Sequence, residues 1–193
     1  MKNTFVISCP IDTYSGYGAR ARDFVKSIIE SDKYDVKILP QRWGSTPEKF
    51  IDQNKEKWGF LSQYIIPQLT EKPDYWCQIT VPNEFQPVGK CNIGLTAGIE
   101  TTVCDGTWIE GCNRMNMVLT SSNHSKRVFE ETQFHKDNDK NQIVKLEVPI
   151  KVLIEGADLD TYKITKTFKN TELFNHINEI PEDYAYLFVG HWM

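Results

Sequence analysis

The part of the sequence that most constrains the fold is residues 92–131, in which two apolar runs alternate with two helical patterns. The runs at 93–96 and 117–120 have the length of buried strands. Apolar residues repeat at helical spacing within 106–115, and Ser121 or Ser122 is placed to cap a second, charged helix. This order of strand, helix, strand and helix favours an open parallel sheet, whose ligands bind at the edge where strands end and helices begin.

The N-terminal part of the chain repeats the same pattern. Residues 4–8 predict a buried strand, and 35–39 predict a second strand that stops at Pro40. Between them, from Ala19, an apolar stripe with helical spacing is formed by Ala21, Phe24, Val25, Ile28 and Ile29. The two strands should be parallel, because a helix crosses over between them.

The remaining segments complete an α/β fold, which we predict to be a Rossmann-like open parallel sheet with helices on both faces. Thr46, Pro47 and Glu48 form a helix start in an irregular helical region at 45–75, and 74–81 predicts a third strand. Residues 133–142 are polar and loop-like, and 143–154 predict one or two strands interrupted at Pro149.

The C-terminal part predicts a domain boundary. We expect a first domain at 1–157, then a linker at 158–184 with a short helix near 171–177. Residues 186–190 have the pattern of a buried strand with nothing after it to cover its faces. We therefore expect the chain to be a fragment whose residues 185–193 begin a second, truncated domain.

Composition excludes several classes of protein. A formal net charge of −4 argues against a nucleic-acid binder, which would carry a basic face. No apolar run approaches the roughly 18 residues of a membrane span, and the N-terminus lacks a signal peptide, so a cytoplasmic protein without a membrane span is expected. The five cysteines are odd in number and lie in apolar contexts, which predicts reduced thiols, and neither they nor the four histidines show zinc spacing.

A glycine loop precedes the first predicted helix. Gly16 and Gly18 allow close approach of the backbone, and the helix start behind them offers unpaired amides to an anion. With Ala21 they match the G-x-G-x-x-A spacing of dinucleotide-binding folds, but about seven residues separate them from the strand, and Arg42 stands near where that fold has an acid. A helix-capping loop, an anion or sugar contact and a nicotinamide site all remain open.

Polar residues gather where the predicted strands end. Glu100 follows one strand, Asn83 another, and Ser122 and His124 a third. Glu100 is placed either to accept a hydrogen bond from a sugar or acceptor hydroxyl, or to hold its own turn. Helix capping alone accounts for Ser122, and His124 has no acid partner visible in the sequence.

Several motifs, taken in order, resemble the N-terminal half of GT-B glycosyltransferases of the retaining, glycogen-synthase-like kind. They are Ser15-Gly16-Tyr17-Gly18, Glu100-Thr101-Thr102 with Trp108, Asn113-Arg114-Met115, Val118 to Lys126, Glu155-Gly156-Ala157-Asp158 and Phe188-Val189-Gly190-His191. His191 stands where that family has an arginine that contacts the donor diphosphate. On this resemblance, 1–157 is an acceptor-side domain and 185–193 opens a nucleotide-sugar-binding domain.

The resemblance implies an enzyme that transfers a sugar from a nucleotide-sugar donor to a glycan, lipid or protein acceptor. The nucleotide-sugar is a co-substrate, and neither a metal nor another cofactor is expected. Glu100 is the predicted catalytic residue. The predicted substrate-binding residues are Ser15, Gly16, Tyr17, Gly18, Asn83, Thr101, Ser122, His124 and His191. Without the second domain these residues should be inactive.

Two alternative functions remain. One is an NADP-dependent oxidoreductase of the same broad fold, with Gly16, Gly18 and Arg42 binding the phosphorylated cofactor. The other is a non-catalytic sugar- or protein-binding module with an exposed aromatic patch, for which burial of Trp43, Trp58 and Trp108 would be unfavourable evidence. A cysteine hydrolase is disfavoured, because no cysteine has a nucleophile context.

Overall fold

Six strands form one parallel sheet in the computed structural model, which describes residues 2–136, 139–159, 161–164, 171–184 and 186. The strands are β1 (Asn3–Cys9), β2 (Tyr34–Pro40), β3 (Tyr75–Ile79), β4 (Cys91–Thr96), β5 (Met117–Thr120) and β8 (Ile150–Val152). Their order across the sheet is β2-β1-β3-β4-β5-β8, and every neighbouring pair is parallel. The predicted α/β, Rossmann-like class is therefore confirmed.

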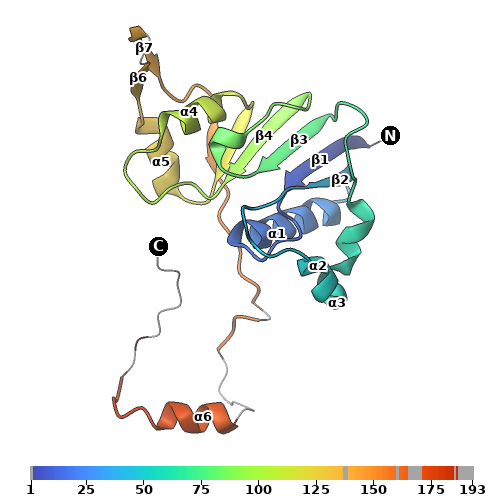
Figure 1. The fold of residues 1–193 in the computed structure, drawn as a ribbon, viewed down its shortest axis with the longest axis vertical. Helices are drawn as coiled ribbons and strands as arrows, with labels where there is room; N and C mark the ends of the chain where they lie inside the picture. Colours follow the sequence, from blue (N-terminus) through green and yellow to red (C-terminus); the bar gives the residue numbers. More distant parts are fainter. Residues whose placement is uncertain (1, 137–138, 160, 165–170, 185, 187–193) are drawn as a thin grey trace. The chain divides into compact units, whose positions relative to one another are not determined.

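Helices cover both faces of this sheet (Figure 1). On one face lie α1 (Gly16–Glu30), α2 (Phe50–Gln53), α3 (Lys55–Trp58) and the 3₁₀ helix η1 (Gly59–Tyr64). On the other lie α4 (Gly106–Asn113) and α5 (Asn123–Glu131). Successive side chains of β1 point to opposite faces of the sheet, so that Phe5 and Ile7 pack in the core on one face and Val6 packs in the core on the other. A strand buried on both faces is expected to be a continuous apolar run, as residues 5–7 are.

The strand order reverses direction beside β1. The chain runs from β1 through α1 to β2 on one side, and returns to place β3 on the other side of β1. In open α/β sheets, ligands bind at the carboxyl ends of the strands next to such a switch point. The loops after β1, β2 and β4 therefore lie at the edge of the sheet where this topology places a ligand.

The predicted helix start at Thr46–Glu48 is wrong. Lys49 adopts the left-handed conformation, with φ of 71°, and α2 begins only at Phe50. The Asp12 carboxylate, from the loop after β1, accepts hydrogen bonds from the amides of Lys49 (3.1 Å) and Ile51 (2.8 Å). A cap supplied from a distant loop thus replaces the local cap that the sequence offers.

The loop predicted at 133–142 is also wrong, because it folds into an antiparallel hairpin. Its strands are β6 (Phe134–Lys136) and β7 (Asp139–Val144), with Phe134 opposite Val144. Val144 packs against the second core, and the Phe134 ring lies 3.4 Å from where a Cβ on Gly106 would stand. Contacts with the domain outweigh the polar composition of the segment.

Other boundaries differ by a few residues. Helix α1 begins at Gly16, three positions before the predicted Ala19, because Ser15 caps it. The loop at 83–87 begins with a short 3₁₀ helix, η2 (Pro82–Glu84). Within 143–154 only β8 joins the parallel sheet, and it follows Pro149 as predicted.

The chain divides into two compact units, 1–155 and 156–193. The second contains α6 (Thr171–Asn178), close to the helix predicted at 171–177. The strand predicted at 186–190 lies outside the described residues, apart from Tyr186. Among the described helices, none has the length and apolar character needed to span a bilayer.

Candidate functional site

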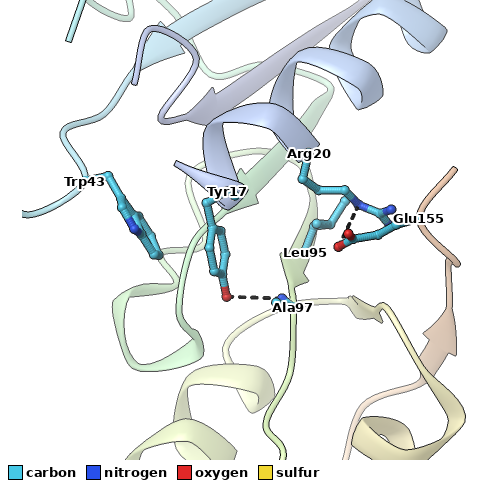
Figure 2. Close-up of a pocket in the computed structure, with 7 residues that line it drawn as sticks. Tyr17, Arg20, Trp43, Leu95, Ala97 and Glu155 are labelled. Atoms are coloured by element: carbon cyan, nitrogen blue, oxygen red, sulfur yellow. Dashed lines mark hydrogen bonds and ion pairs between the residues drawn. The ribbon is translucent and has the colours of Figure 1, made fainter. Parts of the chain in front are cut away.

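A pocket of about 220 Å³ opens at the carboxyl edge of the sheet (Figure 2). It is formed by the start of α1, the segment after β2, the end of β4 and the segment after β8. Its lining residues are Gly16, Tyr17, Arg20, Trp43, Leu95, Ala97 and Glu155. The pocket thus lies where the switch point of the topology places a ligand.

The first turn of α1 supplies one wall. Ser15 is the N-cap, and its hydroxyl accepts a hydrogen bond from the Gly18 amide at 2.9 Å. The amides of Gly16 and Tyr17 donate to none of the described residues, so the positive end of the helix retains two free donors beside the pocket.

The two glycines of this turn have different roles. A Cβ on Gly16 would meet nothing within 4 Å, whereas one on Gly18 would stand 2.5 Å from the Thr13 carbonyl oxygen. Gly18 is buried, and Thr13 lies between it and the rest of the loop. Gly16 therefore leaves open space at the pocket, while Gly18 lets the loop pack closely on its own helix.

An aromatic pair forms the second wall. The rings of Tyr17 and Trp43 stack with centroids 4.1 Å apart and planes inclined by 25°. The Tyr17 hydroxyl contacts the Thr96 hydroxyl at 3.0 Å and accepts a hydrogen bond from the Ala97 amide at 3.1 Å. Burial raises the pKa of Tyr17, and the negative charges of Glu100 and Glu155 raise it further. The phenol is therefore neutral at physiological pH and tied to β4.

Opposite charges face this wall. The Arg20 Nε lies 3.9 Å from the Glu155 Oε1, and a guanidinium nitrogen of Arg20 also donates to the Leu153 carbonyl. The Arg20 side chain is only 12% exposed, but that of Glu155 is 53% exposed. Figure 2 shows Tyr17 between Trp43 on one side and Arg20 with Glu155 on the other. The arginine is held in place, and the carboxylate remains accessible.

The loop after β4 is held beside the pocket by the start of α5. Ser121 donates to the Ala97 carbonyl (2.6 Å), Ser125 donates to that of Ile99 (3.3 Å), and the His124 Nε2 lies 3.2 Å from that of Thr101. The carbonyls of three alternate residues in this loop thus contact side chains at the start of α5. Gly98, with φ of 93°, allows this approach, because a Cβ there would stand 2.2 Å from the Ser125 Oγ.

Glu100 lies within this loop, between the held carbonyls of Ile99 and Thr101. It is exposed and has no hydrogen-bond partner among the described residues. Its charge reaches Tyr17, since it contributes to the raised pKa of that phenol. The structure therefore presents Glu100 as an accessible carboxylate in the loop that follows the lining residue Ala97.

The other predicted site residues fall into three groups. Gly16 and Tyr17 line the pocket, with Ser15 and Gly18 behind them in the same turn. Thr101, Ser122 and His124 belong to the neighbouring loop and α5, where Ser122 is the N-cap and accepts from the Ser125 amide. Asn83 lies in η2, where its carbonyl accepts from Arg114, away from the pocket lining. His191 lies outside the described residues.

Sequence reasoning missed five lining residues, namely Arg20, Trp43, Leu95, Ala97 and Glu155. Arg20 was visible only as a polar residue on the outer face of α1, one turn after the Ser15 cap. Trp43 was named only among the aromatic residues whose burial bears on an exposed binding patch; it is partly buried, whereas Trp58 is 9% exposed. Glu155 appeared in a motif, but nothing in its spacing connects it to Arg20.

Thiol and metal chemistry find little support at this site. Burial raises the pKa of Cys9 and Cys77 far above the usual range, and raises that of Cys112 to about 12. Such thiols are not nucleophilic at neutral pH. Within the described part of the chain, no group of three or more His, Cys, Asp or Glu is arranged to hold a metal ion.

Comparisons of the chain with models of known protein families, with curated proteins and with solved structures found no match. The function is therefore inferred from the geometry of the pocket and of the neighbouring loop after β4.

Proposed function

We propose that this chain is the acceptor-side domain of a GT-B glycosyltransferase, which transfers a sugar from a nucleotide-sugar to an acceptor hydroxyl. The observation that carries the proposal is the pocket at the carboxyl edge of the sheet, which combines an aromatic wall with an arginine–carboxylate pair. The loop that carries the accessible Glu100 continues from the lining residue Ala97. Sugar-binding sites need such a combination, because a sugar ring has apolar C–H faces and hydroxyls around its edge.

The proposed chemistry joins an acceptor oxygen to the anomeric carbon of the donor while the bond from that carbon to the diphosphate oxygen breaks. The departing diphosphate takes the electron pair of the broken bond and then the proton of the acceptor hydroxyl, and free amides at the start of α1 are suited to stabilise the developing anion. Glu100 would accept a hydrogen bond from the acceptor hydroxyl and orient it. A second domain, facing this edge of the sheet, would supply the nucleotide-sugar site.

The nicotinamide alternative has less support. Gly18, which that function requires for close approach of a pyrophosphate, packs against Thr13 and has its amide capped by Ser15. Arg42, the candidate for a cofactor phosphate, lies 3.8 Å from the Glu48 carboxylate. The chain can be titrated into reduced nicotinamide cofactor while the fluorescence of the cofactor is recorded. A saturable change in that fluorescence would favour the oxidoreductase over the glycosyltransferase.

The test is an assay of sugar transfer and donor hydrolysis by the complete protein that contains this chain, with a panel of uridine, guanosine and adenosine diphosphate sugars. We expect one donor to be consumed and Glu100→Ala, which removes the hydrogen-bond acceptor, to lower kcat by about 100-fold or more. Glu56→Ala, which removes an exposed carboxylate on α3, is the matched control and should leave kcat unchanged. Failure to consume any donor would refute the enzyme; full activity of Glu100→Ala would refute only its role.

A further inference from the structure

We infer that the pocket between Tyr17 and the Arg20–Glu155 pair binds a single neutral hexose ring, with its C–H face on Tyr17 and adjacent hydroxyls on the two charged side chains. The claim that this hexose is the terminal sugar of the acceptor rests on the proposed function. The claim that the pocket binds a hexose rests on the geometry of the pocket alone.

The aromatic wall is suited to a sugar face. The Tyr17 hydroxyl is already held by hydrogen bonds with the Thr96 hydroxyl and the Ala97 amide. What Tyr17 offers a ligand is therefore its ring face, because Trp43 already covers the other side at 4.1 Å. Leu95 adds an apolar surface to the lining. Stacked rings of this kind are rigid, so little conformational entropy is lost when a ligand packs against them.

The charged pair matches the edge of a sugar. Each sugar hydroxyl both donates and accepts a hydrogen bond, while an arginine only donates and a carboxylate only accepts. Arg20 and Glu155, 3.9 Å apart, therefore serve both needs of two neighbouring hydroxyls. The bond from Arg20 to the Leu153 carbonyl holds the guanidinium in position before a ligand arrives. Hydrogen bonds to charged groups are about twice as strong as neutral ones, which favours a small polar ligand here.

Charge and size argue against other ligands. A phosphate would be attracted by Arg20 and the start of α1, but Glu155 lines the same pocket and its carboxylate lies 3.9 Å from the Arg20 guanidinium. A volume of about 220 Å³ lies below the roughly 300–1,000 Å³ of pockets that enclose drug-sized ligands. One ring fits this volume better than a whole nucleotide-sugar does.

The experiment is an NMR titration of the ¹⁵N-labelled 193-residue chain with methyl α-D-glucopyranoside, methyl α-D-mannopyranoside and methyl β-D-galactopyranoside. We expect at least one glycoside to shift the amides of Gly16, Tyr17 and Ala97 with a Kd of about 1 mM, the affinity typical of a ligand of this size. Glu155→Ala should raise the Kd at least about tenfold, through loss of a hydrogen bond to a charged group.

Two controls address charge and folding. Glu30→Gln and Lys26→Met remove one charge of each sign from α1, away from the pocket, and should leave the Kd unchanged. Arg20→Met should weaken binding like Glu155→Ala. Because Glu155 is largely exposed, Glu155→Ala should keep the wild-type spectrum outside the pocket, so that a loss of binding is not mistaken for unfolding.

Inorganic phosphate and uridine are the opposing probes. Saturable shifts at the same amides with either of them, and none with the glycosides, would overturn the inference. An unchanged Kd in Glu155→Ala would also overturn it. If a glycoside binds but the complete protein consumes no nucleotide-sugar, the proposed function fails and the sugar pocket stands; if donors are consumed but no glycoside binds, only the pocket assignment fails.

Discussion

Two arginines in this chain each donate to two backbone carbonyls, but only one of them is buried. Arg22, on α1, is 3% exposed and donates to the carbonyls of Ile11 (2.9 Å) and Thr13 (3.0 Å). Arg114, after α4, is exposed and donates to those of Phe85 (2.8 Å) and Asn83 (2.7 Å). Substitution of each by methionine therefore compares the same number of bonds in two environments.

The expected loss in the free energy of unfolding differs between the two variants, because water can reach a carbonyl left without its donor in only one of them. In Arg22→Met, two buried carbonyls lose their donor, at about 1–3 kcal/mol each, and the guanidinium 3.5 Å above the Phe50 ring is lost as well. The methionine retains part of the apolar packing of the arginine stem, so we expect a loss of about 3 kcal/mol. In Arg114→Met, water replaces the donor at the exposed carbonyl, and we expect a loss of about 1 kcal/mol.

The measurement is urea unfolding of both variants and the wild type, followed by circular dichroism and supported by thermal melts. For a chain of this size, about 3 kcal/mol corresponds to a fall in Tm of roughly 6–12 °C. Burial lowers the pKa of Arg22 to about 10, so the residue is charged throughout the neutral range used. Equal losses for the two variants, or a larger loss for Arg114→Met, would refute the reasoning that burial sets the value of these bonds.

Three further predictions concern local structure. Gly111→Ala should lose about 1–3 kcal/mol in urea unfolding, because its Cβ would stand 1.9 Å from the Pro82 carbonyl oxygen, whereas Gly59→Ala, with its nearest contact at 3.6 Å, should gain up to about 1 kcal/mol. Hydrogen bonds from Thr107 lower the pKa of Asp105, so its stabilising effect is present above the unfolded-state pKa and is lost as pH falls through the folded-state pKa; Asp105→Asn should flatten acid unfolding. Ser121→Ala should speed hydrogen exchange at 97–101, and unchanged exchange would contradict the role of its bond to the Ala97 carbonyl.

Much of the fold could be read from local patterns. Continuous apolar runs predicted strands buried on both faces, and β1, β4 and β5 lie where those runs are. The helix pattern of 15 residues in α1 was found to within a few positions, because the apolar stripe depends only on neighbours three and four residues apart. The candidate site was only partly predictable: Gly16 and Tyr17 were identified, but the rest of the pocket was not.

The failures share a physical cause, which is a partner far away in the chain. Local signals placed a helix start at Thr46, but Asp12 caps α2 from 37 and 39 residues away. Polar composition indicated a loop at 133–142, yet pairing and packing made it a hairpin. Arg20 and the Leu153 carbonyl that it contacts are 133 residues apart in the chain, and no local pattern records that contact.

The sequence by itself determined the alternation of strands and helices, because hydrophobic periodicity and capping act over a few residues. Only the tertiary structure decided which glycine faces the pocket and which packs inside a loop, since Gly16 and Gly18 differ in nothing but their surroundings. It also decided that Tyr17 and Trp43 would stack opposite Arg20 and Glu155, because the order of strands in the sheet, and not their order in the chain, brings those segments to one edge.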